Sequence, residues 1–175
     1  MKAFGFAGWS GAGKTTLIEQ LIPRFTMRGI GVSVIKHAHH RFDVDTPGKD
    51  SWRHREAGAR EILITAENRW VLMHELRGAP EPGLHAQLRR FEPVDLVLVE
   101  GYKSARLPKI EVHRGAAGKP LLAPTDPDIV AIASDVAERE LRERLCGRDL
   151  GCLALDDVDG IADFVVAHPG LVIAS

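Results

Sequence analysis

The chain is poor in cysteine, has no long apolar run and carries no excess of one charge. It has two cysteines in 175 residues, Cys146 and Cys152, whose spacing is not that of a metal-binding pair. We therefore expect reduced thiols and a cytoplasmic location. No apolar stretch is long enough to span a bilayer, and Gly5 and Gly8 interrupt the first one, so we expect neither a secretory signal nor a membrane partner. The formal net charge of −1 gives no reason to expect binding to nucleic acid.

Internal repeats and low-complexity segments are also absent. A chain of 175 residues is long enough for one domain with a hydrophobic core, and we expect residues 1–175 to form a single nucleotide-binding domain. Short apolar segments alternate with segments of helical periodicity along most of the chain. This order favours an α/β fold whose central sheet is mostly parallel.

Residues 8–15 read Gly-Trp-Ser-Gly-Ala-Gly-Lys-Thr and match the phosphate-binding pattern G-x-x-x-x-G-K-[S/T]. An apolar segment, residues 3–7, precedes them and predicts a strand, while a helical pattern follows them. In such a loop the glycines let backbone N–H groups turn towards phosphate oxygens. We expect Lys14 to reach the β- and γ-phosphates as a catalytic residue and the Thr15 hydroxyl to bind Mg²⁺. The predicted nucleotide-binding residues here are Ser10, Gly11, Ala12, Gly13, Lys14, Thr15 and Thr16.

A nucleotide triphosphatase also needs an acidic side chain near its magnesium ion. Residues 94–101 read Val-Asp-Leu-Val-Leu-Val-Glu-Gly, an apolar strand pattern that ends in a carboxylate. Glu100 lies at the end where a parallel sheet binds ligands, so we predict it as a catalytic residue and a Mg²⁺ ligand. Asp95 begins the pattern and should lie at the opposite end of the sheet.

The polar run of residues 36–51 has two interpretations. Its histidines, His37, His39 and His40, with His54 beyond them, are typical of a transition-metal site, and would make the chain a nucleotide-dependent, nickel-type metal carrier. Alternatively the run is a switch loop, with Asp43 or Asp45 near Mg²⁺ and with Lys49, Ser51 or His54 near an anionic ligand. We favour the switch loop, because adjacent histidines often point in different directions and no cysteine joins them.

Two further features bear on nucleotide recognition. Residues 129–135 form an apolar strand pattern followed by Asp135, where an aspartate could bind the N1–H and exocyclic amine of guanine. The Asn-Lys pair that often precedes such an aspartate is missing, and Asp135 could equally cap the next helix. Trp9 within the phosphate-binding pattern is unusual, and we assign it no role.

The remaining pattern predicts helices and strands as follows. Helices are expected at residues 14–28 with Gly29 as the C-terminal cap, from about residue 50, at 84–91, at 138–144, and from about 156 or 157. Strands are expected at residues 31–36, 61–65, 70–74, 94–99, 109–113, 129–133 and 152–155. The strands at 61–65 and 70–74 should form a hairpin, and Pro23 should kink the first helix.

Taken together, these segments resemble the family of molybdopterin-guanine dinucleotide biosynthesis protein B (MobB). The phosphate-binding loop is common to many proteins. The run of His39 and His40 followed by Asp-Val-Asp-Thr-Pro-Gly-Lys-Asp-Ser at residues 43–51 is far more specific. Residues 35–37, 98–103 and 132–135 also match, and the resemblance extends over nearly the whole chain.

This resemblance implies a P-loop GTPase fold, a three-layer sandwich around a mostly parallel, mixed sheet. It implies GTP and Mg²⁺ as cofactors, weak hydrolysis of GTP to GDP and phosphate, and a homodimer. The implied partners are a MobA-type guanylyltransferase, which joins a GMP unit to molybdopterin, and molybdopterin or its guanine dinucleotide. By position Asp45 becomes a catalytic residue and, with Thr15 and Glu100, a Mg²⁺ ligand. The residues implied to surround a pterin or another anionic ligand are His37, Lys49, Asp50, Ser51 and Lys103.

The leading hypothesis is therefore a GTP-binding accessory protein that supports conversion of molybdopterin to its guanine dinucleotide. No glutamine or arginine finger is evident in the sequence, so hydrolysis should be slow. The metal carrier stays an alternative. A third hypothesis is a small-molecule kinase, which would need an arginine-bearing lid, with Arg53, Arg55 and Arg60 as candidates.

Overall fold

The computed structural model describes residues 1–38 and 42–173, which divide into two compact units. The first unit, here called the sheet unit, comprises residues 1–37 together with the chain from residue 84 onwards. The second, here called the insert unit, comprises Ala38–Gly83. The insert unit thus interrupts the sequence of the sheet unit between two of its strands.

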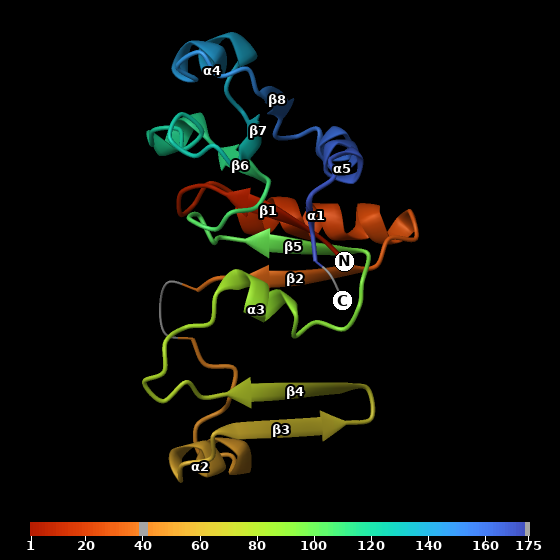
Figure 1. Cartoon of the computed structure of the whole chain (residues 1–175), viewed down its shortest axis with the longest axis vertical. Coiled ribbons are helices and arrows are strands. Elements are labelled where there is room, and N and C mark those ends of the chain that lie inside the picture. The colour runs from red at the N-terminus through yellow and green to blue at the C-terminus, as the bar shows by residue number, and fades with distance from the viewer. Residues whose placement is uncertain (39–41, 174–175) are drawn as a thin grey trace. The chain divides into compact units, whose positions relative to one another are not determined.

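A seven-stranded, mostly parallel sheet forms the centre of the sheet unit (Figure 1). Its parallel strands are β1 (Lys2–Ala7), β2 (Val32–Lys36), β5 (Leu96–Glu100), β6 (Lys109–His113), β7 (Ile129–Ser134) and β8 (Gly151–Ala154). They follow the order β2-β5-β1-β6-β7-β8, and the short β9 (Leu171–Val172) pairs antiparallel with β1. The predicted α/β class with a mixed sheet is confirmed.

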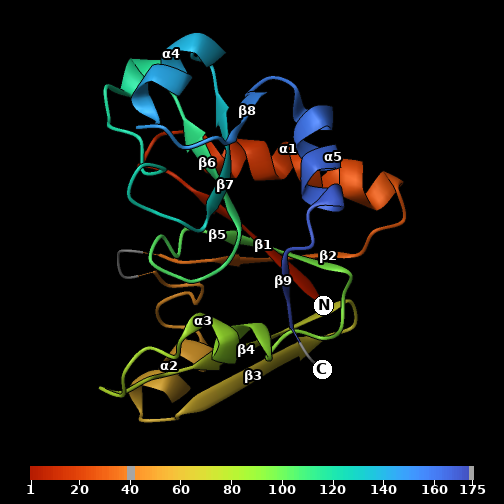
Figure 2. The ribbon, with the colours of Figure 1, turned by 45° about the horizontal axis from the view of Figure 1, so that its top comes forward.

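Helices cover both faces of this sheet. They are α1 (Lys14–Met27), α3 (Leu84–Leu88), α4 (Glu138–Arg144) and α5 (Val158–Ala167), with a short 3₁₀ helix at Gly115–Ala117. Helices α1 and α5 lie side by side on one face (Figure 2). Ion pairs from Arg24 to Asp159 and from Arg28 to Asp163 join their exposed edges.

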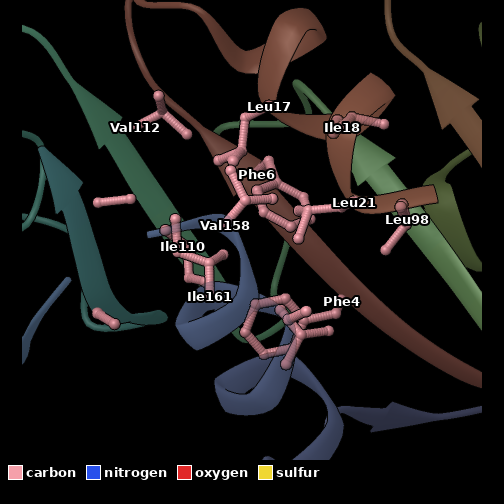
Figure 3. Packing of buried hydrophobic residues seen from close by; sticks show 14 of the residues in the cluster. Phe4, Phe6, Leu17, Ile18, Leu21, Leu98, Ile110, Val112, Val158 and Ile161 are labelled. Atoms are coloured by element: carbon pink, nitrogen blue, oxygen red, sulfur yellow. The ribbon is translucent and has the colours of Figure 1, made fainter. Parts of the chain in front are cut away.

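Alternation along the strands explains the layers, because successive side chains of a strand point to opposite faces. Phe4 and Phe6 of β1 pack with α1 and α5 in one core cluster, whereas Ala3 packs with α3 in another. Figure 3 shows the first cluster, where Leu21 of α1 and Ile161 of α5 meet the two phenylalanines. A third cluster joins α4 to β7. The sheet is therefore the middle layer of a three-layer arrangement.

Strand β6 carries a buried polar face that the sequence analysis did not predict. Lys109, Glu111 and His113 alternate with apolar residues and expose 1%, 0% and 3% of their surface. The Lys109 ammonium donates to two backbone carbonyls and pairs with Asp126 at 2.8 Å. The Glu111 carboxylate accepts from the backbone N–H groups of residues 122 and 123, while burial raises the pKa of Glu111. Two of these three polar groups thus hold loops against the sheet.

The insert unit contains one helix and one hairpin. Helix α2 (Asp50–Glu56) begins where the sequence predicted, and β3 (Glu61–Ala66) pairs antiparallel with β4 (Arg69–His74). The predicted hairpin is confirmed, with two residues, Glu67 and Asn68, between the strands. Apolar side chains on this hairpin are exposed, including Leu63 at 59% and Trp70 at 65%.

Most expected boundaries in the sheet unit lie within a few residues of those observed. Helix α1 continues through Pro23 and ends at Met27 with Arg28 as its C-terminal cap, one residue before the predicted Gly29, which follows with φ of +74°. Helix α3 is shorter than the expected 84–91, and β5 begins at Leu96 and includes Glu100. The short β9 was not predicted. In the described part of the chain, no helix has the length and apolar character needed to cross a membrane.

Candidate functional site

The phosphate-binding loop connects β1 to the start of α1 at the carboxyl edge of the sheet. Three of its glycines have positive φ: Gly8 at 146°, Gly11 at 80° and Gly13 at 93°. A Cβ atom on Gly8 would lie 2.4 Å from the backbone oxygen of Val112 in the neighbouring β6. A Cβ on Gly11 would meet nothing within 4 Å. Gly8 is therefore required by a close approach of two backbones, and Gly11 by its conformation alone.

The side chain of Lys14, at the start of α1, reaches back to the first two residues of this loop. Its ammonium donates to the backbone oxygens of Gly8 at 3.0 Å and of Trp9 at 2.9 Å. Burial lowers the pKa of Lys14 below its usual value, an effect that the negative charge of Glu100 opposes. A partly desolvated ammonium in a loop of this pattern is suited to bind a phosphate oxygen.

Thr15, Glu100 and Lys36 meet on the β5 side of the loop. The Thr15 hydroxyl donates to Oε1 of Glu100 at 2.7 Å, and Nζ of Lys36 lies 3.3 Å from both oxygens. Glu100 is 6% exposed and is the last residue of β5, in register with Phe6 of β1. A hydroxyl and a carboxylate are oxygen ligands of the kind that Mg²⁺ prefers, so this pair fits a magnesium ion bound with a phosphate. Lys36 was not among the site residues predicted from the sequence.

Asp95 lies at the opposite end of β5 from Glu100, as expected. Asp95 precedes β5 and its carboxylate accepts from the backbone N–H of Gly31 at 2.7 Å. Its function in the structure is to fix the start of β2.

A cavity of about 850 Å³ lies on the other flank of the loop, between α1 and the ends of β7 and β8. It is lined by Gly13 and Thr16 of the phosphate-binding segment and by Ser134 and Asp135 after β7. The predicted phosphate residue Thr16 and the predicted base residue Asp135 therefore face one space. A cavity of this size is within the range that holds a small ligand such as a nucleoside.

Asp135 does not cap the helix that follows it, which excludes one of its two sequence-based interpretations. The N-terminal cap of α4 is Ala137, with no side-chain hydrogen bond. Instead Oδ1 of Asp135 accepts from the backbone N–H of Gly115 at 2.8 Å, and Oδ2 lies 3.6 Å from Nη1 of Arg114. The carboxylate thus joins the end of β7 to the end of β6.

Two lysines approach Trp9, the second residue of the phosphate-binding loop. Its indole N–H donates to the backbone oxygen of Pro120 at 2.8 Å. Nζ of Lys103 lies 4.4 Å from the ring centroid and Nζ of Lys119 lies 6.0 Å from it. The backbone oxygen of Lys103 in turn accepts from buried Lys109 at 2.6 Å. The predicted anion-binding residue Lys103 thus lies beside the loop, and Lys109 fixes its backbone.

His37 follows β2 at the same edge of the sheet. Its backbone N–H donates to the backbone oxygen of Glu100 at 3.0 Å, and its ring lies 4.8 Å from the ring of Tyr102, centroid to centroid. Of the five residues predicted to surround a pterin or another anion, His37 and Lys103 belong to the sheet unit.

The other three, Lys49, Asp50 and Ser51, belong to the insert unit, as does Asp45, the predicted Mg²⁺ ligand. There the Ser51 hydroxyl donates to Oδ1 of Asp45 at 2.7 Å, while Lys49 and Asp50 form the exposed start of α2. Oδ2 of Asp45 is buried and has no hydrogen-bond partner among the described residues.

Asp43 forms a different contact from the one considered for it. The guanidinium of Arg55 binds both of its carboxylate oxygens, at 2.8 and 2.6 Å. These hydrogen bonds lower the pKa of Asp43 to about 2 and raise that of Arg55. Asp43 was considered as a magnesium ligand and Arg55 as part of a kinase lid. In the structure they form an ion pair with each other.

The histidine-rich metal site is only partly within the described structure. His39 and His40 lie outside the described residues. Among residues 1–38 and 42–173, no group of three or more His, Cys, Asp or Glu side chains is arranged to hold a metal ion.

Comparison with known proteins gives consistent matches. Residues 3–135 match the family model MobB, molybdopterin guanine dinucleotide synthesis protein B. Over 164 residues the chain is 43% identical to the molybdopterin-guanine dinucleotide biosynthesis adapter protein of Escherichia coli K12, which covers 92% of this chain and 89% of that protein. The adapter protein of Haemophilus influenzae is 46% identical over 134 residues, and the match covers 75% of this chain and 73% of that protein.

Solved structures show the same fold. A crystal structure of molybdopterin-guanine biosynthesis protein B superimposes with a TM-score of 0.72, at 24% identity, covering 94% of this chain and 97% of that chain. The crystal structure of Bacillus subtilis MobB gives a TM-score of 0.68 at 23% identity, covering 95% and 97%.

Substitutions at two glycines test the geometry of the phosphate-binding loop. Gly8→Ala should destabilise the fold by more than about 3 kcal/mol, because it adds a backbone clash to a strained φ. Gly11→Ala, the matched control, should cost about 1–2 kcal/mol, the strain of a left-handed residue alone. Urea unfolding monitored by circular dichroism measures both. Equal losses for the two variants would contradict the close approach of Gly8 to Val112.

Proposed function

The chain belongs to the family of molybdopterin guanine dinucleotide synthesis protein B, and from this membership we propose that it is a GTP-binding adapter protein in molybdenum cofactor biosynthesis. The relatives in E. coli and H. influenzae carry the name of adapter protein for molybdopterin-guanine dinucleotide biosynthesis. The same role is proposed for this chain, namely support of a guanylyltransferase of the MobA type.

The observation that carries the nucleotide part of the proposal is the contact of Thr15 with Glu100. A hydroxyl from the phosphate-binding loop and a buried carboxylate from the adjacent strand lie 2.7 Å apart. A phosphate-binding loop without a nearby acid would suit any anion, whereas this pair suits the Mg²⁺ that accompanies a nucleoside triphosphate. Bound there, Mg²⁺ would neutralise charge that develops on the phosphates.

The described residues also support slow hydrolysis. Lys14 and the loop amides would bind and orient the phosphates, and Glu100 is the acid next to them. Yet Glu100 is in contact with Thr15 and Lys36, which leaves it poorly placed to act as a base towards water. We propose that the chain binds GTP, hydrolyses it weakly, and acts mainly as a nucleotide-holding partner.

Recognition of a pterin or its guanine dinucleotide is proposed for His37 and Lys103 in the sheet unit. Both lie at the edge of the sheet that holds the phosphate-binding loop, through the contacts of His37 with Glu100 and of Lys103 with Trp9. An aromatic ring and an ammonium suit a flat heterocycle that carries a phosphate. For Asp45, Lys49, Asp50 and Ser51 the support is the family resemblance.

Nucleotide titration tests the first part of the proposal. We expect the chain to bind GTP more tightly than ATP in the presence of Mg²⁺. Lys14→Ala should weaken GTP binding roughly 10- to 100-fold, since it removes a charge-assisted hydrogen bond. Glu100→Gln should reduce the part of the affinity that depends on Mg²⁺, while Glu143→Gln, an exposed acid on α4, should change nothing. Isothermal titration calorimetry gives the dissociation constants, and a preference for ATP would contradict the assignment.

A reconstituted reaction tests the adapter role. Purified MobA-type guanylyltransferase is supplied with molybdopterin, GTP and Mg²⁺, and the guanine dinucleotide is quantified by chromatography. Adding this chain should raise the yield of dinucleotide, and Lys14→Ala should raise it less because its GTP affinity is lower. A yield that does not respond to the wild-type chain would refute the role.

We also propose a homodimer, as the family resemblance implies. Hairpin β3–β4 supports it, because a two-stranded sheet is marginally stable by itself and this one exposes apolar pairs on both faces. Leu63 pairs with Leu72 on one face and Ile64 with Val71 on the other, each side chain being at least 40% exposed. A second copy of the chain is the proposed cover.

Light scattering of the purified chain should give about twice the monomer mass of 19.2 kDa. Replacing Leu63 and Leu72 together by Lys should shift the mass towards the monomer, because two charges would then face the partner hairpin. Glu67→Lys in the turn is the control and should remain dimeric. A wild-type chain that stays monomeric at high concentration would disprove the homodimer.

A further inference from the structure

Arg114 is the residue immediately after β6, at the edge of the sheet that carries the phosphate-binding loop. Its guanidinium lies over Gly13, the last glycine of that loop. The position of a Cβ on Gly13 would be 3.1 Å from Nε and 3.3 Å from Nη2 of Arg114. The absence of a side chain at Gly13 thus leaves room for a cation directly beside the loop amides.

The carboxylate of Asp135 lies near this guanidinium but does not occupy its hydrogen-bond donors. Nη1 of Arg114 lies 3.6 Å from Oδ2 of Asp135, longer than a hydrogen bond, and Oδ1 of Asp135 is bound to the N–H of Gly115. Within the part of the chain that the structure describes, the Arg114 side chain has no shorter polar contact and is 44% exposed. Five N–H donors in a planar fork are therefore held near the loop and are available to an anion.

The two flanks of the loop differ in what they can bind. Thr15 and Glu100, the predicted Mg²⁺ ligands, lie on the side of β5. A Mg²⁺ ion held by them would neutralise charge on the terminal phosphates of a nucleoside triphosphate. Arg114 lies on the side of β7, lining the cavity of about 850 Å³ together with Thr16 and Asp135. A nucleotide with its terminal phosphates near Glu100 has this cavity on the other flank of the loop as a space for its α-phosphate and nucleoside.

We propose that Arg114 binds the α-phosphate of the nucleotide from the cavity side, opposite the magnesium ion. The proposal rests on the proposed function, in that the loop must hold a nucleotide at all. Asp135 acts on the phosphate through Arg114 as a positioning residue. Because GTP and GDP share the α-phosphate, Arg114 contributes equally to the binding of both and does not distinguish the triphosphate from its product.

Calorimetric titration of wild type and three variants tests this assignment. Arg114→Gln keeps a polar side chain of similar length and removes the charge, whereas Arg114→Lys keeps the charge and loses the fork. Arg139→Gln, on an α4 side chain that is 93% exposed, is the matched control. Arg114→Gln should weaken the binding of GTP and of GDP by the same factor, about 10- to 100-fold. Arg114→Lys should lose less affinity than Arg114→Gln for both nucleotides, and Arg139→Gln should bind both with the affinity of wild type.

Three results would overturn the proposal. One is unchanged affinity of Arg114→Gln for both nucleotides. Another is a loss confined to GTP, which would place the guanidinium at the γ-phosphate. The third is an equal loss in Arg139→Gln, which would indicate a general effect of charge. If wild type itself binds neither GTP nor GDP, the proposed function fails instead, so the two failures are separable. Thermal melting of each variant establishes that it is folded under the conditions of titration.

Discussion

The structure depends on the parallel pairing of β1 with β5 on one side and β6 on the other. The register sets Phe6 opposite Glu100 and Ala7 opposite Glu111, so all three strands end at nearly the same level. The chain that leaves each strand therefore emerges at one edge of the sheet, as ligand sites of parallel sheets do. The phosphate-binding loop, the acid Glu100 and the cation Arg114 come from three separate segments, and this pairing alone brings them together.

Buried charge on β6 then fixes the loops that surround this edge. Lys109 binds the carbonyls of residues 103 and 105 and the carboxylate of Asp126, and Glu111 binds two backbone N–H groups. Irregular loops expose backbone polar groups that need partners, and an ion inside the protein needs partners of its own. Here the buried ions and the backbone groups of the loops serve as partners for each other. The loop around Lys103 and the segment that contacts Trp9 are consequently held in place from beneath.

Sequence patterns revealed the parts of the site whose chemistry is local. The loop of residues 8–15 and the terminal acid of β5 could be predicted, because each is encoded in a short run with a fixed position in a βαβ unit. Lys36 and Arg114 could not, since their significance arises only when β2 and β6 are placed beside the loop. The buried face of β6 was missed for a related reason: alternating polar residues normally indicate a solvent-exposed face, and here a loop covers them. Asp135 was left between two interpretations, and its contacts with Gly115 and Arg114 exclude the helix cap.

Strands β2 and β5 are parallel neighbours, so the chain between them has to travel back along the sheet in any version of this fold. Residues 84–95, which include α3, complete that return inside the sheet unit. Ala38–Gly83 adds nothing to strand order, because the segment leaves after β2 and rejoins before the return begins. Changes in the length or sequence of this segment therefore leave the order and register of the sheet strands unaltered. One stretch of the chain can thus vary in length and composition while the parallel sheet beside it keeps its strand order.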